Sequence, residues 1–298
     1  MATERELNKR IKSVKNISQV TSALAAVSAS KASRAQRRVE ATRDYAGKAF
    51  EILNNLASQT AAIHPLLTVR ERINKACLIL MTSDRGLAGA YNANIVGMAE
   101  QFVRAFPAPI EVIAIGRKGR DLMIRRGYNV VAAYDDMPDP PSVLDISAIA
   151  HTVTEEFLTE AVDQVFIAYT DFVNLITRIP SVKQLLPLKP LDFEGMAVAD
   201  FVEKTDLSGV EDRAYIYEPR PEILLDTVVP RFTRLQIYQC LLESVASEHS
   251  ARMVAMNNAT DNAGELIEVL TLERNKARQE NITNEILDIV GGAEALSR

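Results

Sequence analysis

The 298-residue sequence is poor in several features that define other protein classes. It has only two cysteines, Cys77 and Cys240, which lie far apart and form no CxxC or metal-binding spacing. Both are expected to be buried thiols in a reducing compartment. No run approaches the ~20 apolar residues of a membrane span, and the N-terminus has no apolar signal region. These absences predict a soluble protein that reaches a membrane only through another protein or a surface contact.

Catalytic and metal-binding patterns are missing as well. The three histidines, His64, His151 and His249, are scattered and lack the spacing of a metal site. His249 lies between Ser247 and Ser250, but one helix cannot easily aim a serine at a histidine two or three positions away. We therefore expect His249 to be a surface or seam residue of a helix, and we expect no catalytic residue, metal or cofactor.

Acidic residues are absent from most of the first 40 residues. Leu7 to Val39 contains eight Lys or Arg residues and no Asp or Glu, and Asn16 to Ser30 has no charge at all. Acidic residues are concentrated from Asp192 to Asp226. A basic helix fits acidic partners such as nucleic acid, anionic lipid or an acidic protein surface. A solvated helix face is the alternative interpretation.

Both ends of the chain have the pattern of long helices, over Ala2 to Ser58 and Pro221 to Leu296. In the first, Thr3 and Glu6 have the spacing of a capping box. Neither Gly nor Pro occurs before Gly47. Apolar residues recur in steps of three and four, which predicts an amphipathic seam: Leu7, Ile11, Val14, Ile17, Val20, Leu24 and Val27.

The last segment has heptad spacing and predicts an antiparallel coiled coil with the first. At about 1.5 Å per residue, the first helix reaches roughly 80 Å and the last roughly 100 Å. Part of this shaft should project beyond a domain, where apolar residues are covered only by each other or by other subunits. The expected seam residues are Ala259, Ala263, Leu266, Leu270, Ala277, Ile282, Ile286, Ile289 and Leu296.

Between the helices, short apolar runs alternate with helical stretches, which predicts a small Rossmann-like, doubly wound α/β domain with a largely parallel sheet. A further strand at Thr177 to Pro187, of different direction, should edge the sheet. Pro138, Pro140 and Pro141 mark an exposed loop. Buried strands are expected at 76–82, 110–115, 129–134 and 164–170, and helices at 90–105 and 143–160.

The turn from Thr82 to Asn92 follows a strand and opens a helix, where phosphates often bind. Only Gly86 and Gly89 are present, so neither GxGxxG nor GxxxxGK[ST] is complete. The favoured interpretation is a tight connection in which the glycines allow close backbone approach. A phosphate or dinucleotide site is the alternative.

Several long motifs, in matching order from near residue 2 to 296, resemble the gamma subunit of F-type ATP synthases. They are RIKSVKNI at 10–17, SDRGLAGAYN at 83–92, YIYEP at 215–219, LLESVASEHSARMVAMNNATDN at 241–262 and NKARQ at 275–279. The resemblance implies a coiled-coil helix at 1–60, an α/β foot at 70–190, an acidic connecting segment at 191–220 and a second coiled-coil helix at 221–298.

The resemblance also implies a role and partners. The chain would be the non-catalytic central rotor shaft of a proton-translocating enzyme, inside a ring of three alpha and three beta subunits. Its foot would lie against the epsilon subunit and the membrane c-ring. Rotation of the c-ring would turn the shaft and drive the catalytic beta subunits through their states. Membrane association would go only through the c-ring.

Residues that would contact the ring follow from the same resemblance. Leu24 stands in the place of a family Met, and the uncharged Ala-rich band around it departs from the family pattern. Arg278 with Gln279 matches a pair that contacts a beta-subunit loop. The expected ring contacts are Lys9, Arg10, Lys12, Leu24, Lys31, Arg34, Arg278, Gln279, Ile286, Ile289 and Leu296. The expected foot contacts are Asp84, Arg85, Gly86, Gly89, Tyr91 and Asn92.

Two missing features favour one type of ATP synthase over the others. Leu188 to Arg234 has no cysteine, so the thiol switch of chloroplast relatives is not expected. Met1 without a transit-like extension favours a bacterial protein, peripheral on the cytoplasmic face of the plasma membrane. Two alternatives stay open: a nucleotide-binding enzyme built on the α/β domain, and a basic coiled coil that binds nucleic acid. The latter lacks any aromatic residue before Tyr45 to stack on bases.

Overall fold

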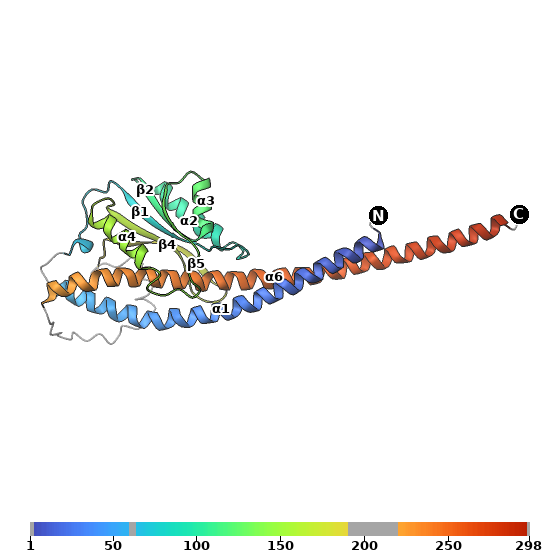
Figure 1. The fold of residues 1–298 in the computed structure, drawn as a ribbon, viewed down its shortest axis with the longest axis horizontal. Coiled ribbons are helices and arrows are strands. Elements are labelled where there is room, and N and C mark those ends of the chain that lie inside the picture. The colour runs from blue at the N-terminus through green and yellow to red at the C-terminus, as the bar shows by residue number, and fades with distance from the viewer. Residues whose placement is uncertain (1–2, 60–63, 190–219, 297–298) are drawn as a thin grey trace. The chain divides into compact units, whose positions relative to one another are not determined.

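The structure, a computed structural model, describes residues 3–59, 64–189 and 220–296. The predicted acidic segment, and with it the motif at 215–219, lies outside these residues apart from Arg220. The elements, in chain order, are α1 (Glu4–Gln59), η1 (Pro65–Leu67), β1 (Ala76–Met81), α2 (Tyr91–Ala105), β2 (Ile110–Ile115), α3 (Arg117–Arg125), β3 (Val130–Tyr134), α4 (Ser147–Leu158), β4 (Gln164–Phe172), β5 (Arg178–Leu186) and α6 (Pro221–Leu296) (Figure 1). The long terminal helices and the central α/β pattern are confirmed.

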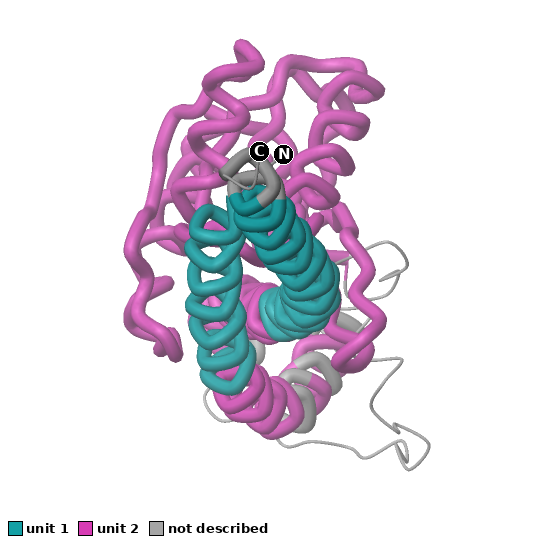
Figure 2. The backbone as a smooth tube through the Cα atoms, turned by 90° about the vertical axis from the view of Figure 1, so that its right-hand side faces the viewer, with its two compact units in different colours: residues 1–28, 252–298 teal, residues 29–251 magenta. Residues whose placement is uncertain are grey.

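The chain divides into two compact units (Figure 2). The smaller unit consists of residues 1–28 and 252–298, and the larger consists of residues 29–251. Each long helix contributes one part to each unit, because α1 continues past residue 28 and α6 begins before residue 252.

The larger unit contains a five-stranded sheet of order β3-β2-β1-β4-β5. Strand β1 is parallel to both of its neighbours, with Leu78 opposite Val112 and Phe166. Strand β3 is parallel to β2, whereas β5 is antiparallel to β4. The predicted edge strand of different direction is therefore confirmed.

Side chains of β1 alternate between two cores, as the pleat of a strand requires. Ala76, Leu78 and Leu80 belong to the core that includes residues of α2 and α3. Cys77 and its alternating neighbours Ile79 and Met81 belong to the core that includes residues of α4 and α6. Both cysteines are buried and reduced, and burial is the main reason that the pKa of the Cys77 thiol is raised. The sheet is thus covered by helices on both faces (Figure 1).

Two details of the α/β region differ from expectation. Strand β3 was predicted as a buried strand, but it forms an edge of the sheet and Val131 is 43% exposed. Helix α3 was not predicted, because only Gly119 and Met123 are buried within its charged sequence. Gly119 is required there: a Cβ atom would lie 2.6 Å from Thr82 Oγ1.

The smaller unit is an antiparallel pair formed by the start of α1 and the end of α6. Leu7, Ile11 and Leu270 form its buried cluster. Further along, the hydroxyls of Thr21 and Thr260 are 2.7 Å apart. The capping box at the start of α1 is confirmed: Thr3 N–H donates to Glu6 Oε2 (3.0 Å), and Glu6 N–H donates to Thr3 Oγ1 (3.4 Å).

The seam of α1 runs through smaller residues than predicted. Ile17, Val20 and Val27 were assigned to it, yet they are 54–59% exposed. The buried positions are instead Thr21, Ala25 and Ser28. They continue the alternating spacing of four and three from Leu7 and Ile11. The position in this repeat therefore determines which residues are buried, and at these three positions the buried side chains are small.

The end of α6 also departs from the predicted seam. Leu266 is 46% exposed, and the neighbouring Ile267 packs against the buried cluster instead. Ala263 and Leu270 are buried as expected. Ile282, Ile286 and Ile289 are exposed, so they form no seam within the described chain.

Candidate functional site

The last described turns of α6 form an apolar surface that the chain itself leaves open. Every residue from 281 to 290 is exposed. Large apolar side chains at this density on a surface are typical of a contact with another protein. Leu296 belongs to α6, but its side chain lies outside the described residues. The exposed apolar residues are Ile282, Ile286, Leu287, Ile289 and Val290, which are named here the α6 tip.

Most of the charged and polar residues predicted to face a ring are also exposed. On α1 these are Lys9, Arg10, Lys12 and Arg34, and on α6 they are Arg278 and Gln279. Leu24 is half-buried. The uncharged band between the basic residues presents Ile17, Val20 and Val27 to the outside. Their roles in binding a partner stay predictions.

Lys31 differs from the other basic residues because it is used inside the larger unit. Its Nζ lies 2.6 Å from Asp139 Oδ2, in the loop between β3 and α4. The buried His249 of α6 approaches the same oxygen, with Nε2 at 3.1 Å. The hydrogen bond from His249, together with Lys31, outweighs burial and holds the pKa of Asp139 well below its usual range. The loop is thereby bonded to both long helices.

The carbonyl of Pro141 reinforces this attachment. It accepts hydrogen bonds from Arg38 of α1 (3.4 Å) and from the Tyr238 hydroxyl of α6 (3.3 Å). The proline-rich loop was predicted as an exposed loop, and Pro138 and Pro140 are exposed whereas Pro141 is buried. Its contacts to the helices could not be read from the sequence.

Polar side chains of α6 join the helix to the end of β4. Ser247 donates to Thr170 O (3.2 Å), and the Thr170 N–H donates to Ser244 Oγ (3.3 Å). The fully buried Glu243 accepts the Phe172 N–H (3.1 Å). The serine on the other side of His249, Ser250, donates to the carbonyl of Leu175. Both serines near His249 thus hold α6 against β4 and the loop that follows it.

The turn after β1 is closed by its own side chains. Ser83 N–H donates to Asn92 Oδ1 (3.0 Å), and Asn92 Nδ2 donates to Ser83 Oγ (2.8 Å). Asp84 accepts the Arg117 N–H (3.0 Å). Gly89 has φ +57°, a conformation that glycine adopts without strain. The Ser83 N–H is therefore already bonded within the chain and is not free for a phosphate, so the geometry favours a tight connection over a phosphate site.

The six predicted foot residues differ in exposure. Arg85, Gly86 and Gly89 are exposed, whereas Asp84 and Asn92 are half-buried in the turn network. Tyr91 is buried and packs with Ala88 and with Ala251 of α6. Sequence reasoning treated all six as surface contacts, and their contact with partners stays a prediction.

A partly buried ion pair, between Arg70 and the buried Asp163, was missed by sequence reasoning. Arg70 donates to Asp163 Oδ1 (2.8 Å) and its guanidinium lies 4.7 Å from the centre of the Phe157 ring. Asp163 also accepts the N–H groups of Asn74 (2.7 Å) and Lys75 (3.2 Å). Burial raises the pKa of Asp163, but these hydrogen bonds outweigh it and the net pKa is lowered. No local motif signals a pair separated by 93 positions.

Within the described residues, no three His, Cys, Asp or Glu side chains form a group that could hold a metal ion. No helix of the described chain is long and apolar enough to cross a membrane.

Comparison with known proteins defines the class. The family model described as ATP synthase matches residues 3–296. The ATP synthase gamma chain of Roseiflexus castenholzii is 43% identical over 302 aligned positions, which cover 100% of this chain and 99% of that protein. The gamma chain of Moorella thermoacetica is 41% identical, covering 99% of this chain and 100% of the relative. This chain therefore belongs to the family of ATP synthase gamma chains.

Solved structures agree in fold. A chain of the Euglena gracilis mitochondrial ATP synthase, solved with OSCP, F1 and the c-ring, has a TM-score of 0.67 and 21% identity, covering 98% of this chain and 94% of that chain. A chain from the central stalk and c-ring of the Tetrahymena thermophila enzyme has a TM-score of 0.59 and 24% identity, covering 80% and 99%.

Proposed function

We propose that this chain is the central rotor shaft of an F-type ATP synthase. The observation that carries the proposal is the full-length similarity to gamma chains, at 43% identity, in a chain whose terminal helices pair. The structural relatives come from rotor and central-stalk assemblies, which supports the same role.

The proposed mechanism is mechanical. The shaft can shift a catalytic subunit from one conformational state to another only if the two states differ in their contact energy with the shaft. A stiff helix pair with an uneven surface meets that need. In this chain, the exposed Ile17, Val20 and Val27 alternate with small residues, and basic residues flank the band on both sides.

Partners follow from this role. The α6 tip fits an apolar sleeve formed by alpha and beta subunits, because its apolar side chains have no cover in the described chain. Lys9, Arg10, Lys12, Arg34, Arg278 and Gln279 would meet acidic or polar elements of that ring. Lys31 would contribute less to such contacts, since Asp139 already binds its ammonium group.

The foot of the shaft would use the α/β region to bind the epsilon subunit and the membrane c-ring. Arg85, Gly86 and Gly89 are its exposed candidate contacts. The chain would lie on the cytoplasmic face of a bacterial plasma membrane, attached through the c-ring, and would couple proton flow to ATP synthesis and hydrolysis. The chemistry would occur in the beta subunits and not in this chain.

The two alternative functions have less support. An enzyme on the α/β region would need a phosphate site at the turn after β1, where the Asn92 side chain accepts the Ser83 N–H. A nucleic-acid-binding coiled coil has no support in the family to which the chain belongs.

Reconstitution tests the proposal. The chain would be assembled with alpha and beta subunits from the same source, and ATP hydrolysis and rotation of a probe on the α/β region would be recorded. We expect assembly, hydrolysis that depends on this chain, and stepwise rotation. Hydrolysis that is unchanged when the chain is omitted would contradict the proposal.

A further inference from the structure

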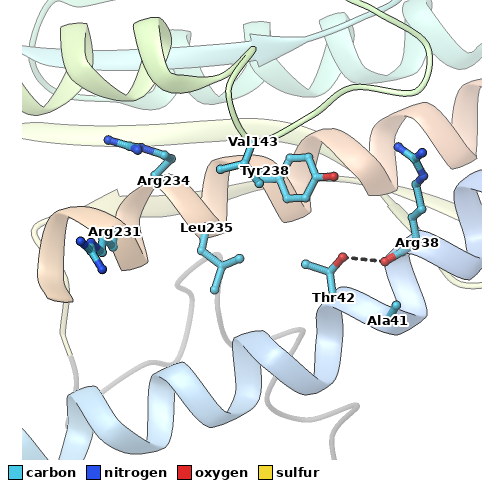
Figure 3. Close-up of a pocket in the computed structure, with 8 residues that line it drawn as sticks. All are labelled: Arg38, Ala41, Thr42, Val143, Arg231, Arg234, Leu235 and Tyr238. Atoms are coloured by element: carbon cyan, nitrogen blue, oxygen red, sulfur yellow. Dashed lines mark hydrogen bonds between the residues drawn. The ribbon is translucent and has the colours of Figure 1, made fainter.

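A groove of about 700 Å³ lies between α1 and α6 within the larger unit (Figure 3). The middle of the groove is apolar. Leu235 extends from α6 into the space between the two helices, and Val143 and the Tyr238 ring lie beside it (Figure 3). The ends are cationic: Arg231 and Arg234 lie at one end, and Arg38 lies at the other (Figure 3).

The two arginines of α6 differ in exposure. In the described part of the chain, Arg234 Nε is buried without a hydrogen-bond partner, whereas Arg231 is exposed to solvent. Arg38, at the other end, donates one N–H to the carbonyl of Pro141 and is exposed, so water can meet its remaining donors. A buried donor without an acceptor costs free energy, so this arrangement favours an anionic acceptor from outside the described chain.

We infer that this groove binds a medium-chain carboxylate. The carboxylate would be held by Arg231 and Arg234, since a guanidinium matches a carboxylate in two-point hydrogen bonding. The hydrocarbon chain would lie over Leu235 and run toward Arg38. Small-molecule sites have cavities of about 300–1,000 Å³ that are mostly apolar with a few placed polar groups, and they often lie between helices. The groove fits that description.

The apolar middle of the groove argues for this ligand over a bare inorganic anion. A small oxyanion at Arg231 and Arg234 would leave the apolar middle of the groove, with Leu235, Val143 and Tyr238, unfilled (Figure 3). A hydrocarbon chain fills it and gains free energy from leaving water. The inference depends only on the larger unit and does not require the rotor function.

A fluorescent fatty acid tests the inference. Dansylated undecanoate would be titrated into the purified full-length chain, and the rise in dansyl emission would report entry into an apolar site. We expect saturable binding of one probe per chain, displaced by decanoate. The double variant Arg231→Gln/Arg234→Gln should bind about tenfold more weakly or worse, because each charge-assisted hydrogen bond is worth that order. Arg125→Gln is the matched control, since Arg125 is exposed on α3, and it should bind as the wild type does.

A second variant tests the groove without removing charge. Ala41 is an exposed groove residue of α1, so Ala41→Phe fills the space and leaves the arginines in place. This variant should also lose binding while its circular dichroism and melting temperature stay those of the wild type.

Four results would overturn the inference. The first is absence of saturable binding by the wild type, and the second is equal binding by the arginine variant. The third is equal binding of the uncharged dansylated undecanol. The fourth is displacement of the probe by a hexaglutamate peptide as effectively as by decanoate, which would assign the groove to an acidic segment of a protein partner.

Discussion

The two compact units bury their helices in different ways. In the larger unit, α6 packs large apolar residues such as Phe232 and Ile237 into the core beneath the sheet, and buried Glu243 and Ser247 bond to β4. In the smaller unit, the same helix buries few large residues, among them Leu270 against α1, and leaves others such as Leu266 and Ile286 exposed. One helix thus serves as a core element in one part and as an exposed surface in the other. This difference predicts that substitutions in the core of the larger unit alter folding most, whereas substitutions at exposed positions of the smaller unit mainly alter contacts with partners.

Phe157→Ala should break the larger unit most severely. Phe157 is 1% exposed in the core next to α6, and Phe-to-Ala changes in cores cost about 3–5 kcal/mol. Urea unfolding followed by circular dichroism would measure the loss. Leu144→Ala is the control, because Leu144 is 82% exposed and should change stability by less than about 0.5 kcal/mol. Equal effects of the two variants would show that this core is wrongly placed.

Asp163→Asn should remove the partly buried Arg70–Asp163 charge pair of the larger unit and cost about 2 kcal/mol, since Arg70 loses its charged acceptor. The folded pKa of Asp163 lies below its ordinary value. Its stabilisation is therefore present above about pH 4, the region of an unfolded Asp, and is lost as pH falls toward the folded pKa.

Unfolding measured between neutral and acidic pH would check this prediction. The variant should show a shallower loss of stability in acid than the wild type. Asp121→Asn is the control because Asp121 pairs with Arg120 at the surface, where such pairs contribute about 0–1 kcal/mol. An unchanged acid slope in Asp163→Asn would mean that this pair does not contribute to acid sensitivity.

Ala25→Leu should destabilise the smaller unit, because leucine is larger than the seam between α1 and α6 can hold. Ala25 is 5% exposed in the smaller unit, and added bulk in a packed site costs about 1–3 kcal/mol. Amide hydrogen exchange should speed up in residues 7–28 and 252–277 and stay unchanged in the sheet. Ala26→Leu, at an exposed neighbouring position, should have no such effect. If both variants behaved alike, the seam would not run through Ala25.

Ile289→Ala should have the smallest effect on the isolated chain. Ile289 is 71% exposed, so its removal should change stability by less than about 0.5 kcal/mol. In the reconstituted enzyme, the same change should weaken assembly or the torque measured by probe rotation. Asn281→Ala, a polar position near the tip, is the control. A stability loss without any effect on the assembled enzyme would contradict the proposed role of the α6 tip.

The sequence predicted the fold well where burial follows a simple period. The short apolar run of β1 predicted a strand of the sheet, the spacing of three and four at both ends predicted the helix pair, and the motifs at 83–92 and 241–262 carried the family resemblance. The side chains that form the seam were less well predicted. Large apolar residues such as Val20 and Val27 attracted the assignment, although the regular spacing of Thr21, Ala25 and Ser28 determines which residues face α6.

Contacts between distant parts of the chain could not be predicted. Lys31 and Asp139 are 108 positions apart, and the bond between them depends on where the loop after β3 reaches the helices. The groove is likewise formed by residues that are distant in the sequence, since Arg38 lies on α1 and Arg231 lies on α6. Without a local pattern, a sequence gives no sign of such neighbours.

The open α6 tip also bears on how the protein is made. A chain released from the ribosome before its partners presents Ile286, Leu287, Ile289 and Val290 to other proteins, and exposed apolar surface of this kind promotes aggregation at high concentration. Balanced co-expression with the subunits that cover the tip should therefore raise the soluble yield more than stabilising the sheet would. Purification of the chain alone should benefit from low concentration, which limits self-association through this surface.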